Sequence, residues 1–299
     1  MLTLGIEYVC AETVPSMYLL SGHGEAEFPE IVTKNLDSFG FRYDSINLAL
    51  GDPVPSDCTC VVINTPASDI TALEAATLSN YLASGGNILL ITANGADQFK
   101  NLASVLAEFG LSAEAGNVYE GSSGAYIQSP AVIYPTVSES HNSVAYIAQN
   151  DIPVLLSNSH AIRVAETSGV TATPVFTTTD KAYSVIGGQN GEAGVKNLGV
   201  VAEKENGATV CWIASGGFLS DSLITYTNGG NFYAFYSTMN YLTGNFTSSL
   251  PEIPGVELSE TLITTTATDA NLWGSILIFI VPGAVLGGGI LYWVRRRRR

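Results

Sequence analysis

The sequence predicts an α/β protein in which a doubly wound, mostly parallel sheet is followed by a strand-rich second half and one C-terminal transmembrane helix. Three observations support this fold class. Residues 17–110 alternate between short apolar runs and amphipathic stretches, the pattern of βαβ units. Residues 117–244 shift toward short strands separated by turns. The chain ends in a long uncharged run followed directly by five arginines, Arg295 to Arg299.

The first half contains clear helix and strand signals. Thr71 and Glu74 have the spacing of a capping box, so a helix is predicted to begin there. Gly85 and Gly86 end that helix, because glycine readily adopts the left-handed conformation that follows helix C-termini. The predicted strands are Met17–Ser21, Arg42–Leu48, Cys60–Asn64 and Asn87–Thr92, and the predicted helices are Pro29–Phe39, Thr71–Ala83 and Asp97–Phe109.

The second half contains a predicted hairpin and a predicted helix. Asn206 and Gly207 separate two apolar runs, Leu198–Ala202 and Thr209–Ala214, and this dipeptide favours a turn with both central residues at positive φ. A broad apolar face predicts a helix over Asn231–Leu242. Residues 187–191 are glycine-rich but lack the Lys-Ser or Lys-Thr ending of a phosphate-binding loop. They are interpreted as a hairpin loop, and no ATP site is predicted.

Four regions follow from composition and hydropathy. Residues 1–246 form the predicted folded domain, 247–271 a Thr- and Pro-containing stalk, 272–294 a transmembrane helix and 295–299 an arginine tail. The run from Leu272 to Val294 would span about 34 Å as a helix, enough for a bilayer core of about 30 Å. Gly283 and Gly287 have the small-xxx-small spacing that lets another membrane helix approach closely.

The charge distribution predicts the orientation of the chain. Seven Lys and Arg residues stand against 27 Asp and Glu residues before the apolar run, whereas the tail is entirely basic. The positive-inside rule then places the tail in the cytoplasm and the large N-terminal region outside the membrane. A strongly acidic domain repels phosphate backbones, which argues against a nucleic-acid partner.

Two further expectations concern the ends of the sequence. Residues 1–10 contain no basic segment followed by an apolar one, so the chain is expected to be the C-terminal portion of a longer protein. A wall-anchored adhesin would also combine an apolar segment with an arginine tail. Residues 250–255 read Leu-Pro-Glu-Ile-Pro-Gly rather than the LPxTG motif that such a protein requires, so this alternative is disfavoured.

The best candidate site is the turn formed by Gly22, His23, Gly24 and Glu25. It follows the first predicted strand, at the carboxyl edge where open α/β sheets bind ligands. His23 could act as a general base oriented by Glu25. Alternatively, the turn is structural, and Glu25 caps the helix that follows. We expect His23→Ala to reduce stability or partner binding rather than a chemical step, and a lost cap or turn hydrogen bond to cost about 0.5–2 kcal/mol.

Other candidate chemistry is weak in this sequence. The position of a nucleophile elbow after the fourth strand holds Ala93, Asn94 and Gly95, with no Cys or Ser, so no catalytic residue is predicted. Asn94 is retained only as a possible ligand- or partner-binding residue. Cys58 and Cys60 have no matching Cys or His pair, so neither a metal site nor a cofactor is predicted.

Several short motifs occur in a recognisable order along the chain. They are Leu20–Glu25, Leu82–Leu90, His141–Val144, Gly216–Asp221 and Gly230–Phe232 before an apolar helix. Together with the Pro282-containing helix, they resemble the GldG-like auxiliary components of ABC transport systems, a family named for a gliding-motility protein. The sequence departs from the family in one place, since Asn142 replaces the proline usual after the histidine.

The resemblance implies an amidotransferase- or flavodoxin-like fold that lacks the catalytic cysteine, as also seen in intraflagellar-transport domains. It further implies a non-enzymatic, membrane-anchored extracytoplasmic subunit that works with a separate ABC permease and ATPase on an unidentified cargo. The alternative from another class is an exported hydrolase or carbohydrate-binding enzyme that uses the Gly22–Glu25 turn.

Overall fold

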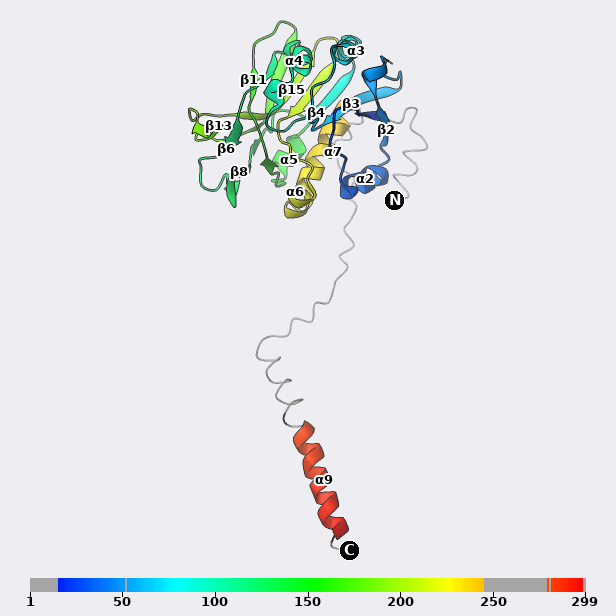
Figure 1. The fold of residues 1–299 in the computed structure, drawn as a ribbon, viewed down its shortest axis with the longest axis vertical. Coiled ribbons are helices and arrows are strands. Elements are labelled where there is room, and N and C mark those ends of the chain that lie inside the picture. The colour runs from blue at the N-terminus through cyan, green and yellow to red at the C-terminus, as the bar shows by residue number, and fades with distance from the viewer. Residues whose placement is uncertain (1–15, 52, 245–278, 280, 298–299) are drawn as a thin grey trace. The chain divides into compact units, whose positions relative to one another are not determined.

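The computed structural model describes residues 16–51, 53–244, 279 and 281–297, and the chain divides into two units, residues 1–248 and 249–299. The first unit is built on a ten-stranded mixed sheet with helices on both faces (Figure 1). Along its main path the strand order is β2-β1-β3-β4-β16-β15-β11-β5, and β12 and β9 extend from β15. The strands are β1 (Ser16–Leu20), β2 (Arg42–Ile46), β3 (Cys58–Asn64), β4 (Asn87–Ile91), β5 (Leu111–Ala113), β9 (Thr136–Val137), β11 (Ile162–Val164), β12 (Val170–Thr177), β15 (Asn197–Lys204) and β16 (Thr209–Ile213).

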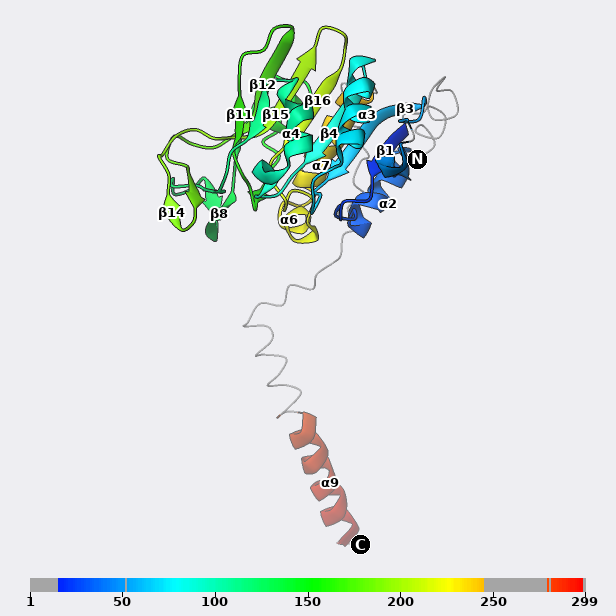
Figure 2. The same ribbon diagram turned by 45° about the horizontal axis from the view of Figure 1, so that its top comes forward.

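The sheet has a parallel part and an antiparallel part. Strands β2, β1, β3, β4 and β16 pair in parallel, as the sequence predicted for the first half. Strand β15 then runs antiparallel to β16, and β11 and β12 run antiparallel to β15. The mixed α/β class with a parallel central sheet is therefore confirmed, and the strand-rich second half completes the same sheet (Figure 2).

The predicted hairpin exists, but its turn differs from the expected one. Gly207 has φ +89°, whereas Asn206 is not in the left-handed region, so the prediction of two positive φ angles is wrong. The Lys204 N–H donates to the Ala208 carbonyl across a three-residue loop. The physical reason is the loop length, because a three-residue hairpin loop needs a left-handed residue only at its last position, here Gly207. The Asn206 Nδ2 donates to two carbonyls at the end of a neighbouring helix, those of Leu82 and Ala83.

Helices cover the two faces of the sheet. Alternate side chains of β3 point to opposite faces, so Val61 and Ile63 join the core beneath α3 and α4, whereas Cys60 and Val62 face the other side. That other side carries α7 (Figure 1). Trp212 of β16 is fully buried. The helices are α2 (Glu30–Ser38), α3 (Ala72–Ala83), α4 (Lys100–Ala107), α5 (Ala145–Gln149), α6 (Asp221–Tyr226) and α7 (Gly230–Leu242), with 3₁₀ turns η1 (Leu48–Leu50) and η2 (Ala96–Gln98).

Local sequence signals explain where α3 begins and ends. The capping box is present: the Glu74 N–H donates to Thr71 Oγ1 at 3.2 Å, and the Thr71 N–H donates to Glu74 Oε2 at 2.8 Å. Gly85 follows the helix with φ +90°. At Gly86, a Cβ atom would lie 2.3 Å from the Tyr81 ring, so any larger residue would force that ring to move.

The helix predicted over Asp97–Phe109 is divided into η2 and α4. Phe99 has ψ 89°, which interrupts the helical path between the two elements. Helix α4 begins again because the Asp69 carboxylate accepts hydrogen bonds from the N–H groups of Asn101 and Leu102. A side chain distant in sequence therefore sets the start of this helix.

Two three-stranded sheets complete the first unit. One has the order β10-β8-β7 and the other β14-β13-β6. The turn at Gly187 and Gly188 joins β13 to β14, which are antiparallel, so the predicted hairpin loop is confirmed. Their strands are β6 (Asn117–Tyr119), β7 (Tyr126–Ile127), β8 (Ser129–Ile133), β10 (Leu156–Ser157), β13 (Tyr183–Ile186) and β14 (Gln189–Asn190).

The second unit contains helix α9 (Val281–Arg297). Gly283 and Gly287 are both exposed on it. The stalk and most of the first third of the predicted 272–294 span lie outside the described residues. Within the described part of the chain, no helix combines the length and the apolar character needed to cross a bilayer. The transmembrane helix, the stalk and the four-region division stay predictions.

Candidate functional site

The predicted site turn lies at the carboxyl edge of the parallel strands, directly after β1. His23 is 7% exposed there and lies between two carboxylates. Its Nδ1 is 3.1 Å from Glu25 Oε1, and its Nε2 is 3.0 Å from Glu74 Oε2. An ionised carboxylate only accepts hydrogen bonds, so an imidazole carrying both protons satisfies both contacts. We call this arrangement of Glu25, His23 and Glu74 the glutamate clamp.

The main-chain N–H and carbonyl of His23 are also hydrogen-bonded within the protein. Its N–H donates to Glu25 Oε2 at 2.8 Å, and its carbonyl accepts from the N–H groups of Ala67 and Ser68. Gly22 and Gly24 have φ +122° and +71°, and a Cβ on Gly24 would lie 3.0 Å from the Cβ of Ala67. The two glycines therefore allow the turn to fold closely over the loop that leads to α3.

Glu74 is the part of this site that sequence reasoning missed. The capping box placed it at the start of α3, but its side chain is fully buried and also binds His23, 51 residues away. One carboxylate thus fixes both the helix start and the site turn. Glu25 contacts His23 itself, and the four predicted residues Gly22 to Glu25 do lie together.

Asn94 does not join the glutamate clamp. It is exposed, and its main-chain N–H donates to the Asn158 carbonyl at 3.3 Å. Within the described residues, no hydrogen bond connects it to the Gly22–Glu25 turn. The tentative grouping of Asn94 with His23 therefore has no contact to support it.

The residue directly after β4 is Thr92, which belongs to a buried chain of hydrogen bonds. The Trp212 indole N–H donates to Thr92 Oγ1 at 2.7 Å, and that hydroxyl is 2.8 Å from His160 Nε2. His160 Nδ1 is 3.1 Å from the Ala161 carbonyl. Each of these hydrogen bonds has one donor and one acceptor only if the proton of the neutral imidazole is on Nδ1. Burial lowers the pKa of His160, which favours this neutral form.

A hydroxyl next to a histidine at this position has the spacing of a nucleophile and its base. Here Thr92, His160 and Trp212 are all completely buried. A substrate cannot reach the hydroxyl in this state, so the chain of hydrogen bonds stabilises the core. Sequence reasoning did not find this contact, because Thr92 and His160 are 68 residues apart.

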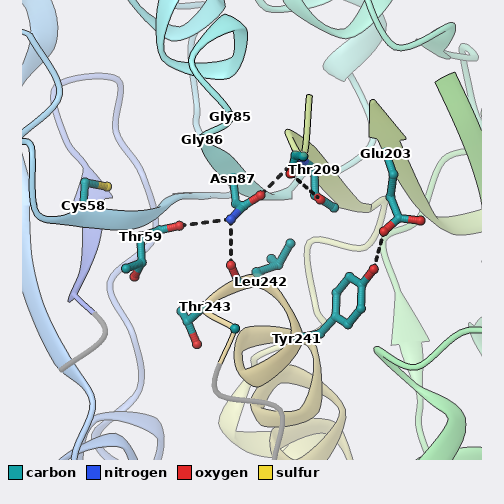
Figure 3. A pocket seen from close by; sticks show the side chains of 12 residues that line it. Cys58, Thr59, Gly85, Gly86, Asn87, Glu203, Thr209, Tyr241, Leu242 and Thr243 are labelled. Carbon is teal, nitrogen blue, oxygen red and sulfur yellow. Dashed lines mark hydrogen bonds between the residues drawn. The ribbon is translucent and has the colours of Figure 1, made fainter. Parts of the chain in front are cut away.

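A pocket of about 490 Å³ lies at the opposite, amino edge of the parallel strands. It is formed where β3, β4 and β16 begin, where β15 ends, and at the last turn of α7 (Figure 3). Asn87 connects these elements: its Nδ2 donates to the Leu242 carbonyl at 2.7 Å and to the Thr59 carbonyl at 3.3 Å, and its Oδ1 accepts from the Thr209 N–H at 3.1 Å.

Glu203 and Tyr241 line one side of the pocket, and His141 contacts both of them from outside the lining. The Tyr241 hydroxyl donates to Glu203 Oε1, and the second oxygen of Glu203 is 3.7 Å from His141 Nε2. The His141 and Tyr241 rings meet edge to face at 5.0 Å. Sequence spacing identifies no carboxylate partner for His141, whereas the structure supplies Glu203 from β15. Burial lowers the pKa of His141, and the nearby Glu203 partly opposes this shift.

Comparison with known proteins bears on the fold. No family model matches the chain, and no curated protein sequence does so either. Among solved structures, the mmIFT52 N-terminal domain is similar, with a TM-score of 0.58 and 18% identity over 76% of this chain and 97% of that domain. At this identity the likeness shows a shared fold alone.

Two further solved structures are weaker likenesses. A putative ThuA-like protein from Parabacteroides merdae has a TM-score of 0.46 and 11% identity over 81% of this chain and 94% of that chain. A glutamine amidotransferase from Thermotoga maritima has a TM-score of 0.44 and 14% identity over 78% of this chain and 99% of that chain. Both scores are too low to carry an argument about this chain.

Proposed function

We propose that this chain is a non-catalytic, membrane-anchored extracytoplasmic subunit of an ABC-type transport system, acting beside a separate permease and ATPase. The observation that carries the non-catalytic part is the glutamate clamp. His23, the most conspicuous candidate base, has both ring nitrogens and its main-chain groups bound within the protein. A general base needs a free nitrogen within reach of a substrate proton.

The elbow after β4 gives a second argument. Its hydroxyl, on Thr92, is buried and accepts the indole proton of Trp212, and Asn94, two residues further along, is exposed. Neither side chain offers an accessible nucleophile of the kind that covalent catalysis uses. A binding or assembly role agrees better with these residues than a hydrolytic one.

The transport role is suggested by the resemblance to GldG-like components and by the apolar run before the arginine tail. In this proposal residues 272–294 cross the membrane, the tail stays in the cytoplasm, and the acidic domain is held outside by the stalk. Because the sequence contains no ATP-binding motif, energy would come from the partner ATPase. Gly283 and Gly287 provide a surface on which a permease helix can pack.

Crosslinking in native membranes tests the proposal. The full chain should recover a multi-spanning permease, and Gly283→Leu combined with Gly287→Leu should reduce the recovery. Gly289→Leu is a matched control, because at 100° per residue it lies about 200° around the helix from Gly287. Recovery without any permease would contradict the transport role, and an equal loss with the control would exclude a specific glycine surface.

Catalysis is tested separately. The purified chain is assayed on glycan and peptide panels next to His23→Gln. Turnover that disappears in His23→Gln while the unfolding midpoint stays unchanged would overturn the non-catalytic assignment and favour the hydrolase alternative.

A further inference from the structure

The amino-edge pocket contains polar side chains whose donor groups are already used within the protein. Each hydroxyl of its lining points to an acceptor of the chain. The hydroxyl of Thr59 donates to the Ser16 carbonyl at 2.8 Å, that of Thr243 to the Met239 carbonyl at 2.9 Å, that of Thr209 to the Gly207 carbonyl at 3.4 Å, and that of Tyr241 to Glu203. Both Nδ2 protons of Asn87 are used as well.

The main-chain donors of the pocket are occupied in the same way. The four glycines in its lining could have formed a cradle of N–H groups for an anion. Their N–H groups instead donate to carbonyls of neighbouring turns. Gly85 donates to Leu82, Gly86 to Tyr81, Gly207 to Lys204 and Gly244 to Tyr241, at 2.9–3.3 Å.

The unused hydrogen-bonding capacity of the pocket therefore consists of acceptors. A hydroxyl that donates one bond keeps two lone pairs, and a carboxylate accepts at about four positions. Glu203 is 34% exposed at the pocket, and one of its oxygens has only the long 3.7 Å contact to His141. A ligand that donates hydrogen bonds would find partners here, and one that only accepts would not.

The electrostatic potential of the pocket is negative, which also favours a ligand that donates hydrogen bonds. Its lining includes the Glu203 carboxylate and no Lys or Arg. The 13-residue helix α7 ends at the pocket, and the C-terminus of a helix carries a partial negative charge. The next residue, Lys204, does not neutralise Glu203, because its ammonium is 3.2 Å from Glu108 and lies over the Phe109 ring.

We propose that the amino-edge pocket binds a small organic cation, an ammonium or guanidinium compound, with Glu203 as its counter-charge. The volume of about 490 Å³ is within the usual range for small-molecule sites and far exceeds that of a single metal ion. The cation donates to Glu203 and to the hydroxyl lone pairs, and Tyr241 holds the carboxylate in place. This site lies at the opposite edge of the sheet from the glutamate clamp, so it stands independently of the transport role.

Calorimetric titration of the full chain in a non-ionic detergent tests this site. The probes are putrescine, agmatine and aminobutanol, with butanediol as a neutral counterpart of similar shape. At least one cation should bind, and butanediol should bind about tenfold more weakly or not at all, because a charged donor contributes more than a neutral one. Equal affinities for the cations and butanediol, or no binding of any cation, would overturn the proposal.

Variants locate the binding. Glu203→Gln keeps the shape of the side chain and should weaken cation binding about tenfold or more. Glu205→Gln is the matched control, because Glu205 is exposed and outside the pocket lining. The affinity of the Glu205→Gln chain for the cation should stay unchanged. If Glu203→Gln does not fold, Thr243→Lys places an ammonium in the pocket and should also abolish binding. Unchanged affinity in the folded Glu203→Gln or Thr243→Lys chain would contradict this site.

Discussion

The two edges of the parallel strands both carry a histidine beside a glutamate, but they differ in how far the glutamate carboxylate is accessible to a ligand. At the carboxyl edge, His23 is buried between Glu25 and Glu74. At the amino edge, Glu203 is part-exposed at the border of a pocket, and its contact with His141 is long. The two edges therefore differ in access: the carboxylates beside His23 are buried, whereas the Glu203 carboxylate is partly exposed to the pocket in which we propose binding.

The largest effect should follow from removing the centre of the glutamate clamp. His23→Ala leaves two buried carboxylates without their partner, so the free energy of unfolding should fall by about 3–5 kcal/mol. This exceeds the 0.5–2 kcal/mol expected from a turn alone. Urea unfolding followed by circular dichroism measures it. Lys34→Ala is the control, since the Lys34 pair with Glu30 is exposed and should contribute little. A loss below 1 kcal/mol in His23→Ala would show that the clamp is not structural.

The buried chain of hydrogen bonds at the elbow should give the next largest effect. Thr92→Val keeps the shape but leaves the Trp212 N–H and His160 Nε2 without the hydroxyl, at a cost of about 2 kcal/mol or more. Thr92→Ser retains the hydroxyl and should recover most of that stability. A larger loss in Thr92→Ser than in Thr92→Val would mean that packing of the methyl group, and not the hydroxyl, matters at this position.

At the amino edge, the shape of the pocket depends on a glycine. Gly86→Ala should lower the stability by about 1–3 kcal/mol, because the new Cβ lies 2.3 Å from the Tyr81 ring. Gly194→Ala serves as the control, since a Cβ there meets no atom within 4 Å. The melting temperatures of the two variants provide the comparison. If Gly86→Ala has the same melting temperature as the control, the Tyr81 ring moves aside at little cost and does not require glycine at position 86.

The pH dependence of stability should be smaller still. Burial lowers the pKa of His160 below its ordinary value of 6.5, so the unfolded chain takes up this proton first as the pH falls. The stability that His160 provides is complete above pH 6.5 and is lost as the pH decreases toward the lowered pKa. The difference in unfolding free energy between the unmodified chain and His160→Gln should therefore shrink from pH 7.5 to pH 5. If this difference in unfolding free energy grows as the pH falls, folding raises the pKa of His160 instead of lowering it.

Local signals in the sequence predicted much of the fold. The capping box at Thr71, the stop at Gly85 and Gly86, and the hairpin around Gly207 depend on neighbouring residues, and all three are present. The predicted turn type was wrong, because the loop has three residues and requires positive φ only at Gly207.

The sites were predicted less completely than the fold, for a physical reason. The Gly22–Glu25 turn was located from its place after a strand, but its second carboxylate comes from Glu74 on α3. The pocket depends on a contact between Asn87 and Leu242, which are 155 residues apart. Such pairs have no spacing or periodicity that a single sequence could reveal, since they arise only when the sheet is assembled.

The most direct test of the difference between the two edges is a titration with putrescine followed by NMR of labelled threonine methyl groups. Thr59, Thr209 and Thr243 line the pocket at the amino edge, whereas Thr65 and Thr92 follow β3 and β4 at the carboxyl edge. The account predicts saturable shift changes for the first three methyl groups and none for the other two. Changes confined to Thr65 and Thr92 would contradict it, because they would place the binding site at the glutamate-clamp edge.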